Sequence, residues 1–380
     1  MSVITGKAGQ APREGARRLL CVLATLGLVL CGVPAGEAQD RELTVVSWGG
    51  SYTRSQILGF VRAYEQATGV DVEMIDYEGG IDEIRSQVRS WNVKWDVVDL
   101  EMLSALDACE EGLLEPIDAA KLKPAPDGTP PQEDFLEGAL IECGAGNVAA
   151  STIIAYDRTR ISRPPASLAD FFDVDEFPGQ RGLRRTPQTN LEWALLADGV
   201  SPDRVYDALG TKEGLDRAFE VLGRIKPFVE WWRLGEDAVR LLETGQVVMT
   251  SAYNGRISAA AERGRPFAIV WDRQVTFMDV WGIPRNGERT DLAMDFVRFA
   301  TATESLAAQA SHIDYGPLRR SSLELLDEAT RAKLPTAPEN RKTAFRRDPA
   351  WWAEHMAELG PRFERWVERP VMVPRDWPAR

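Results

Sequence analysis

The stretch that decides the fold is LTVVSWGGSYTRSQILGFVRAYEQATGVDVEMID, residues 43–76 of the chain. It opens with residues of high strand propensity at 43–47, which a Trp-Gly-Gly-Ser turn follows. Apolar residues then recur at helical spacing over 57–64, and Gly69 predicts the end of that helix. A second β-rich run occupies residues 70–76. Strand, helix and strand in this order predict a parallel, doubly wound α/β sheet.

The same alternation continues along the rest of the chain. Periodicity predicts helices at 82–90, 191–197, 212–222, 236–243, 291–310 and 351–366. β-rich apolar runs predict strands at 95–100, 144–156, 247–251, 267–271 and 278–283. A chain of 380 residues with this pattern is expected to form two α/β domains rather than one.

The first forty residues have the features of a secretory signal peptide. Arg17 and Arg18 precede an apolar run at 19–33, and small residues end the segment at Ala38. An apolar run of about 15 residues is short for a membrane-spanning helix, which needs about 20. We therefore expect residues 1–38 to be removed near Ala38 and the mature protein to work in the periplasm. An uncleaved membrane anchor and a lipid anchor at Cys31 remain as alternatives.

The charge of the chain argues against nucleic acid as a partner. The formal net charge is −13, and residues 1–38 contribute +2, which leaves −15 on the remainder. An acidic surface repels nucleic acid and anionic lipid and favours cationic partners. No long basic run and no later segment suited to membrane insertion occurs in the sequence.

Two cysteines follow the signal segment, Cys109 and Cys143. Two cysteines in an exported protein indicate one disulfide, because the compartment is oxidising. The alternative is a pair of buried free thiols.

Motifs for catalysis or cofactor binding are missing from the sequence. The two histidines, His312 and His355, lie in no metal-binding pattern, and neither a phosphate-binding loop nor a nucleophile elbow occurs. We therefore expect no cofactor, no metal and no enzymatic activity. A hydrolase that uses Asp96, Asp99 or Glu101 as acid and base is the alternative.

Aromatic and acidic residues gather at the predicted strand ends, where open α/β sheets bind small ligands. Ring faces attract organic cations, and a carboxylate neutralises their charge. Asp279 is the most informative of these residues, because an acid inside an apolar run needs a partner. The candidate ligand-binding residues are Trp48, Tyr52, Glu101, Trp231, Trp232, Tyr253, Asp279 and Tyr315.

Six segments, in order, resemble the spermidine/putrescine-binding family of periplasmic solute-binding proteins of ABC importers. They are LTVVSWGGSY, WDVVDLE, GNVAASTIIAYD, GQVVMTSAYNGRI, FMDVWGIPRNG and SHIDYGP. The resemblance implies a two-lobed fold whose chain crosses a hinge three times. It also implies a small amine as ligand and the permease subunits of an ABC transporter as partners.

The ligand-binding residues of that family carry over in part. The resemblance matches its amine-binding carboxylate to Asp279 and its first aromatic to Trp48, and it retains a ring at Tyr253. The loop at residues 186–192 departs from the family because it has no acid before Glu192. A polyamine needs a carboxylate at each end, so a shorter amine or a zwitterion is also possible.

The resemblance also predicts the limits of the two lobes. The first lobe is expected to comprise residues 39–150 and 256–311, and the second residues 151–255 and 312–380. A sensor protein that presents its ligand to a receptor would have the same sequence features.

Overall fold

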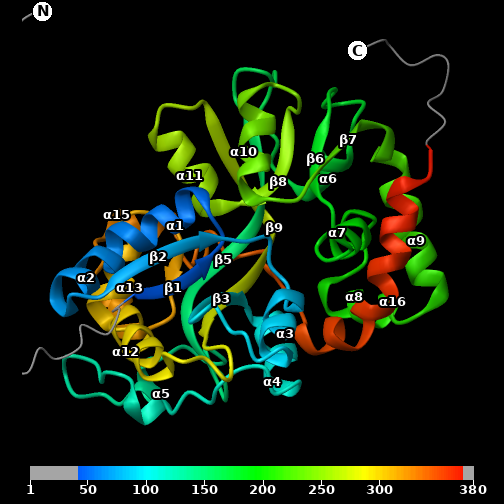
Figure 1. Cartoon of the computed structure of the whole chain (residues 1–380). Helices are drawn as coiled ribbons and strands as arrows, with labels where there is room; N and C mark the ends of the chain where they lie inside the picture. The colour runs from blue at the N-terminus through cyan, green and yellow to red at the C-terminus, as the bar shows by residue number, and fades with distance from the viewer. Residues whose placement is uncertain (1–41, 371–380) are drawn as a thin grey trace, which may run out of the picture. The chain divides into compact units, whose positions relative to one another are not determined.

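The computed structural model describes residues 42–370, and this part of the chain contains one continuous sheet of eleven strands (Figure 1). The signal segment predicted at residues 1–38 lies outside the described residues. The strands are β1 (Glu42–Ser47), β2 (Asp71–Asp76), β3 (Val97–Glu101), β4 (Leu140–Ile141), β5 (Gly144–Asp157), β6 (Arg181–Arg184), β7 (Val229–Trp232), β8 (Met249–Tyr253), β9 (Phe267–Gly282), β10 (Gly316–Pro317) and β11 (Phe345–Arg346).

Helices connect the strands and pack on both halves of the sheet. Within the described range, no helix is both long enough and apolar enough to span a membrane. The helices are α1 (Gly50–Gln56), α2 (Arg62–Thr68), α3 (Asp82–Arg89), α4 (Met102–Glu110), α5 (Pro131–Asp134), α6 (Leu168–Phe172), α7 (Asn190–Ala197), α8 (Val205–Leu209), α9 (Lys212–Ile225), α10 (Gly235–Glu243), α11 (Asn254–Glu262), α12 (Thr290–Ala300), α13 (Thr303–Ala310), α14 (Arg320–Leu325), α15 (Glu328–Lys333) and α16 (Pro349–Glu368).

Two parallel halves make up the sheet, whose strand order is β2-β1-β3-β9-β5-β8-β6-β7. β1 pairs in parallel with β2 and β3, and β6 pairs in parallel with β7 and β8. The long antiparallel strands β5 and β9 join these halves, and both run from one half into the other (Figure 1). The predicted α/β, two-lobed architecture is confirmed.

Each half of the sheet has its own apolar core. In the first, Phe60 packs edge-on against Trp281 at 6.2 Å between ring centroids and against Phe296 at 6.1 Å. In the second, Phe171 packs against Trp193 at 5.9 Å. Most of each core comes from one half of the sheet, although Leu103 of α4 packs into the second core and a small cluster with Tyr52 and Tyr253 lies between the halves.

Two element predictions were wrong in opposite ways, since two predicted strands form one and one predicted helix forms two. Residues 267–271 and 278–283 form one strand, β9, because β5 lies alongside and pairs with both parts across a register shift between Thr152 and Ile154. Residues 291–310 form two helices, α12 and α13, rather than one. The Thr301 hydroxyl bonds back to the carbonyl of Val297 at 2.7 Å where α12 ends.

The structure shows no break in packing around residue 255, where the predicted lobe limits divide the chain. Helix α11 shares an apolar core with α10 and β8, through Ile257 and Ala260. Residues 267–275 of β9 pair with the second half of β5, and residues 276–281 pair with its first half. The limits stay a prediction, because a lobe is defined by what moves together rather than by pairing alone.

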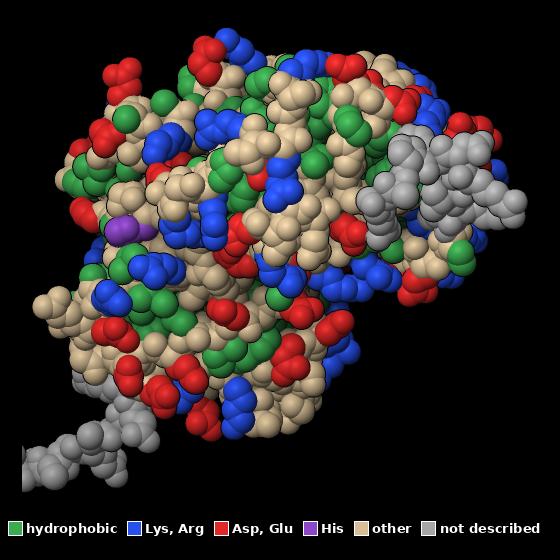
Figure 2. All heavy atoms as spheres, turned by 90° about the horizontal axis from the view of Figure 1, so that it is seen from above, with side chains coloured by type: hydrophobic (Ala, Val, Ile, Leu, Met, Phe, Trp, Pro, Cys, Tyr) green, Lys and Arg blue, Asp and Glu red, His purple; other side chains and the backbone are tan. Residues whose placement is uncertain are grey.

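Charged side chains of both signs are interspersed on the molecular face shown in Figure 2. The net negative charge of the chain is therefore not gathered into one acidic patch on that face.

The predicted disulfide is confirmed between Cys109 in α4 and Cys143 before β5, with 5.7 Å between the Cα atoms. It closes a loop with a sequence separation of 34 residues.

Reduction is expected to lower the free energy of unfolding by about 3–4 kcal/mol, because the open loop gains conformational entropy when unfolded. Urea denaturation with and without reductant measures this difference. The Cys109→Ser/Cys143→Ser double variant should match the reduced protein, and a variant as stable as the oxidised protein would contradict the prediction.

Candidate ligand-binding site

A cavity lies where the carboxyl ends of β1, β3 and β8 meet the middle of β9. Side chains from both halves of the sheet line it, and many of them are rings or carboxylates. The lining residues are Trp48, Tyr52, Tyr77, Glu78, Glu101, Ala150, Arg184, Arg233, Leu234, Gly235, Tyr253, Arg256, Phe277, Asp279 and Tyr315.

The turn after β1 brings the first lobe's residues to the cavity. Gly49 and Gly50 have φ angles of 72° and 61°, in the left-handed region where residues with a side chain are strained. This turn directs Trp48 into the cavity and starts α1, which carries Tyr52. The Trp48 ring packs on Tyr77 at 4.9 Å between centroids.

Three carboxylates share one face of the sheet beside the cavity. In the antiparallel pair β3–β9, Glu101 lies opposite Asp279 and Asp99 lies opposite Trp281. Residues opposite one another in such a pair, and those two positions along, point to the same face. Asp99, Glu101 and Asp279 therefore face the same space, where like charges repel.

Asp279 is the least compensated of the three. It is 5% exposed, and its Oδ1 atom has no hydrogen-bond partner among the described residues. Burial, then the charges of Asp99 and Glu101, raise the pKa of Asp279 well above its ordinary value. A cation that reaches this carboxyl group stabilises its ionised form.

Asp99 is enclosed in a hydrogen-bond network. Its Oδ2 atom accepts from the Tyr52 hydroxyl at 2.8 Å, from Gln56 Nε2 at 2.6 Å and from Asn147 Nδ2 at 2.9 Å. Burial raises the pKa of Asp99 to about 7 even though these donors oppose the shift. The network fixes the Tyr52 ring, which lies 5.4 Å from the ring of Tyr315.

Glu101 already has cationic partners. Arg347, which follows β11, forms an ion pair with it and donates to the Thr189 hydroxyl at 2.9 Å. Arg184 at the end of β6 lies 3.9 Å from the other carboxylate oxygen of Glu101. Glu101 is thus neutralised from the second lobe, whereas Asp279 is not.

Six of the eight predicted ligand-binding residues line this cavity. They are Trp48, Tyr52, Glu101, Tyr253, Asp279 and Tyr315. Rings pack against one another here, since Tyr253 meets Phe277 edge to face at 5.5 Å between centroids.

The structure places the other two predicted residues, Trp231 and Trp232, outside the cavity. Trp231 packs on the last helix, at 5.6 Å from Phe363 and 6.2 Å from Trp366. Trp232 is 2% exposed and lies beneath Tyr253, with 5.7 Å between ring centroids. They alternate along β7, so one faces the C-terminal helix and the other faces the core under Tyr253.

Sequence reasoning missed the cationic residues of the site. Arg184 stands at a strand end, and Arg256 follows the Tyr-Asn-Gly segment at 253–255. An inspection of strand ends for bases as well as acids would have found both. Nothing in the sequence indicates Arg347, since it is distant in the chain from every other residue of the site.

The matching family model is described as bacterial extracellular solute-binding protein, and it covers residues 59–339. This chain belongs to that family. A gamma-aminobutyric acid-binding protein of Pseudomonas aeruginosa is 38% identical to this solute-binding protein over 347 residues, which cover 91% of this chain and 96% of the relative.

Solved structures show the same two-lobed fold. A binding protein of A. tumefaciens R10 in complex with agropinic acid is 28% identical, with a TM-score of 0.77 over 86% of this chain and 99% of that one. A GABA receptor structure is also 28% identical, with a TM-score of 0.75 over 87% of this chain and 99% of that one.

The spermidine/putrescine-binding branch of these proteins shares less with this chain. A representative from Streptococcus pneumoniae has a TM-score of 0.65 over 86% of this chain and 99% of that one, at 16% identity. At that identity the likeness shows the fold alone. The resemblance to solute-binding proteins of importers is therefore confirmed for the family, and the polyamine is left without support from sequence identity.

The raised pKa values predict a pH dependence of stability. Between the ordinary carboxyl pKa and the raised values of Asp99 and Asp279, the folded protein holds more protons than the unfolded chain. Stability contributed by these groups is therefore present at low pH and is lost as the pH rises through this window. Asp279→Asn is expected to hold or raise the melting temperature at pH 8 and to flatten its decline between pH 5 and pH 8.

Thermal unfolding of the ligand-free proteins at several pH values measures this effect. Asp272→Asn is a matched control on the same strand, because Asp272 lies outside the cavity and accepts the amide of Leu168 at 2.9 Å. Parallel pH profiles for the wild type and Asp279→Asn would contradict the buried-charge interpretation.

Proposed function

We propose that this protein captures a small zwitterionic amine, of the γ-amino acid class, between its two lobes and delivers it to an ABC importer. The observation that carries the proposal is the unpaired, buried Oδ1 atom of Asp279 in a cavity lined by rings. An ammonium group supplies both the charge and the N–H donors that this oxygen lacks.

The rings around Asp279 favour an organic cation over a hydrated metal ion. Trp48, Tyr253 and Tyr315 line the same cavity as Asp279. Each ring face over a cation contributes about 0.5–2 kcal/mol, and more when water is excluded. A carboxylate within an aromatic enclosure is therefore selective for an amine.

A cation in the same cavity favours a ligand that also carries a carboxylate. Arg184 lines the cavity, is 25% exposed and approaches Glu101 no nearer than 3.9 Å. Its guanidinium is suited to a carboxylate, because the two groups form paired hydrogen bonds. A polyamine would need a second carboxylate in the enclosure; Glu101 already binds Arg347, and Glu78, the remaining acid of the lining, is exposed. The gamma-aminobutyric acid named for the 38% identical relative belongs to the ligand class proposed here.

Export to the periplasm follows from the leader at residues 1–38, whose cleavage is expected near Ala38. The permease of an ABC transporter is the expected partner. A Bradyrhizobium japonicum ABC transporter substrate-binding protein, 30% identical, supports this role.

No catalytic reaction is proposed for the acids that a hydrolase would need. Asp96 accepts the amide of Thr44 at 2.8 Å and pairs with Arg289 at 3.0 Å, so it stabilises the first strand. Asp99 binds three donors, and Glu101 binds Arg347. Each of these carboxylates has partners within the protein, and Asp96 and Asp99 are not part of the cavity lining, which supports a binding role over acid–base catalysis.

Closure of the lobes would rotate them about the strands that they share. We propose that β5 and β9 bend near Ser151 and Thr276, which lie opposite one another between the two halves. A few residues can absorb such a rotation. The predicted lobe limits of 39–150 with 256–311, and of 151–255 with 312–380, are tested by the same motion. We propose that α11 moves with the second lobe, although these limits place it in the first, because it shares an apolar core with α10 and β8.

Asp279→Asn tests the amine site. The variant keeps the shape of the side chain and removes its charge. Loss of one partner of a desolvated charge pair costs about 2–5 kcal/mol, which is about 30-fold to several thousand-fold in affinity. Titration calorimetry with γ-aminobutyrate measures this loss. Tyr253→Ala, which removes one ring face, is expected to weaken binding less, by about 1–2 kcal/mol.

Asp272→Asn should bind γ-aminobutyrate as the wild type does, because Asp272 lies outside the cavity. Equal affinity of Asp279→Asn and the wild type would show that the cavity does not hold an ammonium group. Binding of putrescine in preference to γ-aminobutyrate would overturn the zwitterion proposal while retaining the amine.

Arg184→Gln tests the carboxylate half of the site. Affinity for γ-aminobutyrate is expected to fall about 10-fold, a discounted value because the side chain is partly exposed. Affinity for propylamine, which lacks the carboxylate, should hold or rise. Arg185→Gln is a matched control, since Arg185 pairs with Glu364 at 2.7 Å away from the cavity. An equal loss for both ligands would contradict a role for Arg184 in carboxylate binding.

A further inference from the structure

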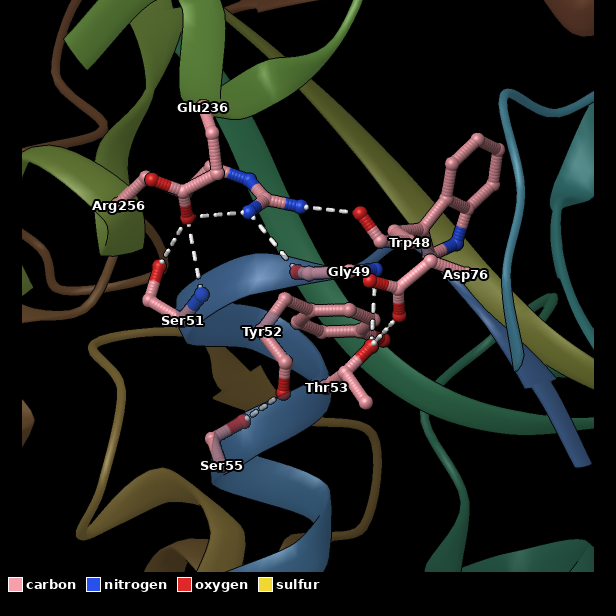
Figure 3. Close-up of polar contacts among 9 residues, drawn as sticks. All are labelled: Trp48, Gly49, Ser51, Tyr52, Thr53, Ser55, Asp76, Glu236 and Arg256. Carbon is pink, nitrogen blue, oxygen red and sulfur yellow. Dashed lines mark hydrogen bonds and ion pairs between the residues drawn. The ribbon is translucent and has the colours of Figure 1, made fainter. Parts of the chain in front are cut away.

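A cluster of polar contacts joins the start of α1 to helices α10 and α11 beside the cavity (Figure 3). Arg256 donates to the carbonyl of Trp48 at 2.9 Å and to that of Gly49 at 3.0 Å. It also pairs with Glu236 at 2.6 Å. Glu236 in turn accepts from the amide of Ser51 at 2.9 Å and from its hydroxyl at 2.8 Å.

The contacts connect two separately packed bodies. The start of α1 belongs to the first half of the sheet, where Tyr52 and Gln56 bond to Asp99 of β3. Helices α10 and α11 belong to the second half, where they share an apolar core with β8. Every bond from Arg256 or Glu236 to residues 48–51 therefore bridges the two lobes.

Both charged groups are held in a defined state. The Arg256 side chain is 3% exposed, so its charge requires the acceptors that surround it. Glu236 is 39% exposed, and although burial opposes the shift, Arg256 and Ser51 lower its pKa. Glu236 therefore stays ionised in neutral solution and keeps accepting from Ser51 and Arg256.

Two glycines keep space for this cluster. A Cβ atom at Gly50 would lie 2.3 Å from Glu236 Oε1, and one at Gly235 would lie 2.5 Å from Arg256 Nε. Any other residue at either position would push the charged groups out of contact. The close approach of the two lobes thus depends on backbone without side chains at these points.

We propose that Glu236 and Arg256 form a clasp that holds the lobes together over the cavity and sets the rate at which the ligand leaves. The inference rests on the proposed function for the ligand, but the clasp itself is defined by contacts between the lobes. Arg256 lines the cavity and Glu236 lies outside its lining. Opening breaks four bonds together, two from Arg256 to the carbonyls of Trp48 and Gly49 and two from Ser51 to Glu236, whereas the Arg256–Glu236 ion pair stays within the second lobe.

The clasp also positions the ring of Trp48. Arg256 binds the carbonyl of Trp48, and the ring of the same residue lines the cavity. Loss of the clasp should speed dissociation more than it slows association, because the closed lobes open more readily when these bonds are missing.

Glu236→Gln is the test variant. The neutral amide oxygen accepts more weakly from Ser51 than the carboxylate does, and it loses the ion pair that holds Arg256 against the carbonyls of Trp48 and Gly49. Dissociation of γ-aminobutyrate, followed by stopped-flow tryptophan fluorescence, is expected to be about fivefold faster, with an association rate within about twofold of the wild type. Gly50→Ala is a second variant, expected to act in the same direction by displacing the Glu236 carboxylate.

Glu243→Gln is the matched control. Glu243 lies on the same helix, α10, and pairs with Arg265 at 2.8 Å within the second lobe. It should leave both rates unchanged. Equal effects of Glu236→Gln and Glu243→Gln would overturn the clasp, since the effect would then come from charge alone.

Spin labels on Arg62→Cys and Glu213→Cys, exposed positions on opposite lobes, report opening without any ligand. The distances between the labels should be longer in Glu236→Gln than in the wild type or in Glu243→Gln. If γ-aminobutyrate binds none of the proteins, the proposed ligand fails and the label distances still decide the clasp. Identical distributions for the wild type and Glu236→Gln would overturn it.

Discussion

The antiparallel pairing of β5 with β9 is the constraint on which the lobes and the cavity both depend. The two strands continue through both halves of the sheet, so each lobe is built onto the same pair. Their middle carries Asp279 and Ala150 into the cavity. A site placed on the shared strands is completed by side chains that arrive from either lobe, and its composition therefore depends on how the lobes meet.

Buried charge decides what the cavity can hold. Glu101 and Asp279 lie opposite one another on neighbouring strands, yet only Glu101 is given a close cation, by Arg347. Asp279 is left with an unpaired oxygen in an apolar, aromatic setting. A protein that retains such a group gives up stability, and binding sites are where natural proteins tolerate that loss. A cationic ligand that pairs with Asp279 removes the electrostatic cost of this buried carboxylate, and the free energy regained contributes to binding.

Buried charge also governs the contacts between the lobes, but there the charged group has partners. Arg256 is as deeply buried as Asp279, but two carbonyl groups and Glu236 accept from its terminal nitrogens, although its Nε has no partner among the described residues. Its partners on the first lobe are backbone atoms of the turn that presents Trp48. The Arg256 side chain therefore links closure of the lobes to the position of the Trp48 ring.

The sequence by itself determined the main strands and helices, the class of fold, the disulfide and most of the aromatic and acidic lining. These features are local, or follow from where strands end: Trp48 comes after a strand, and Asp279 interrupts an apolar run. The tertiary structure alone decided that Trp231 and Trp232 face away from the cavity, because the two neighbours on β7 point to opposite faces. It alone also brought Arg347 to Glu101 across 246 residues, since no periodicity or motif encodes a contact at that separation.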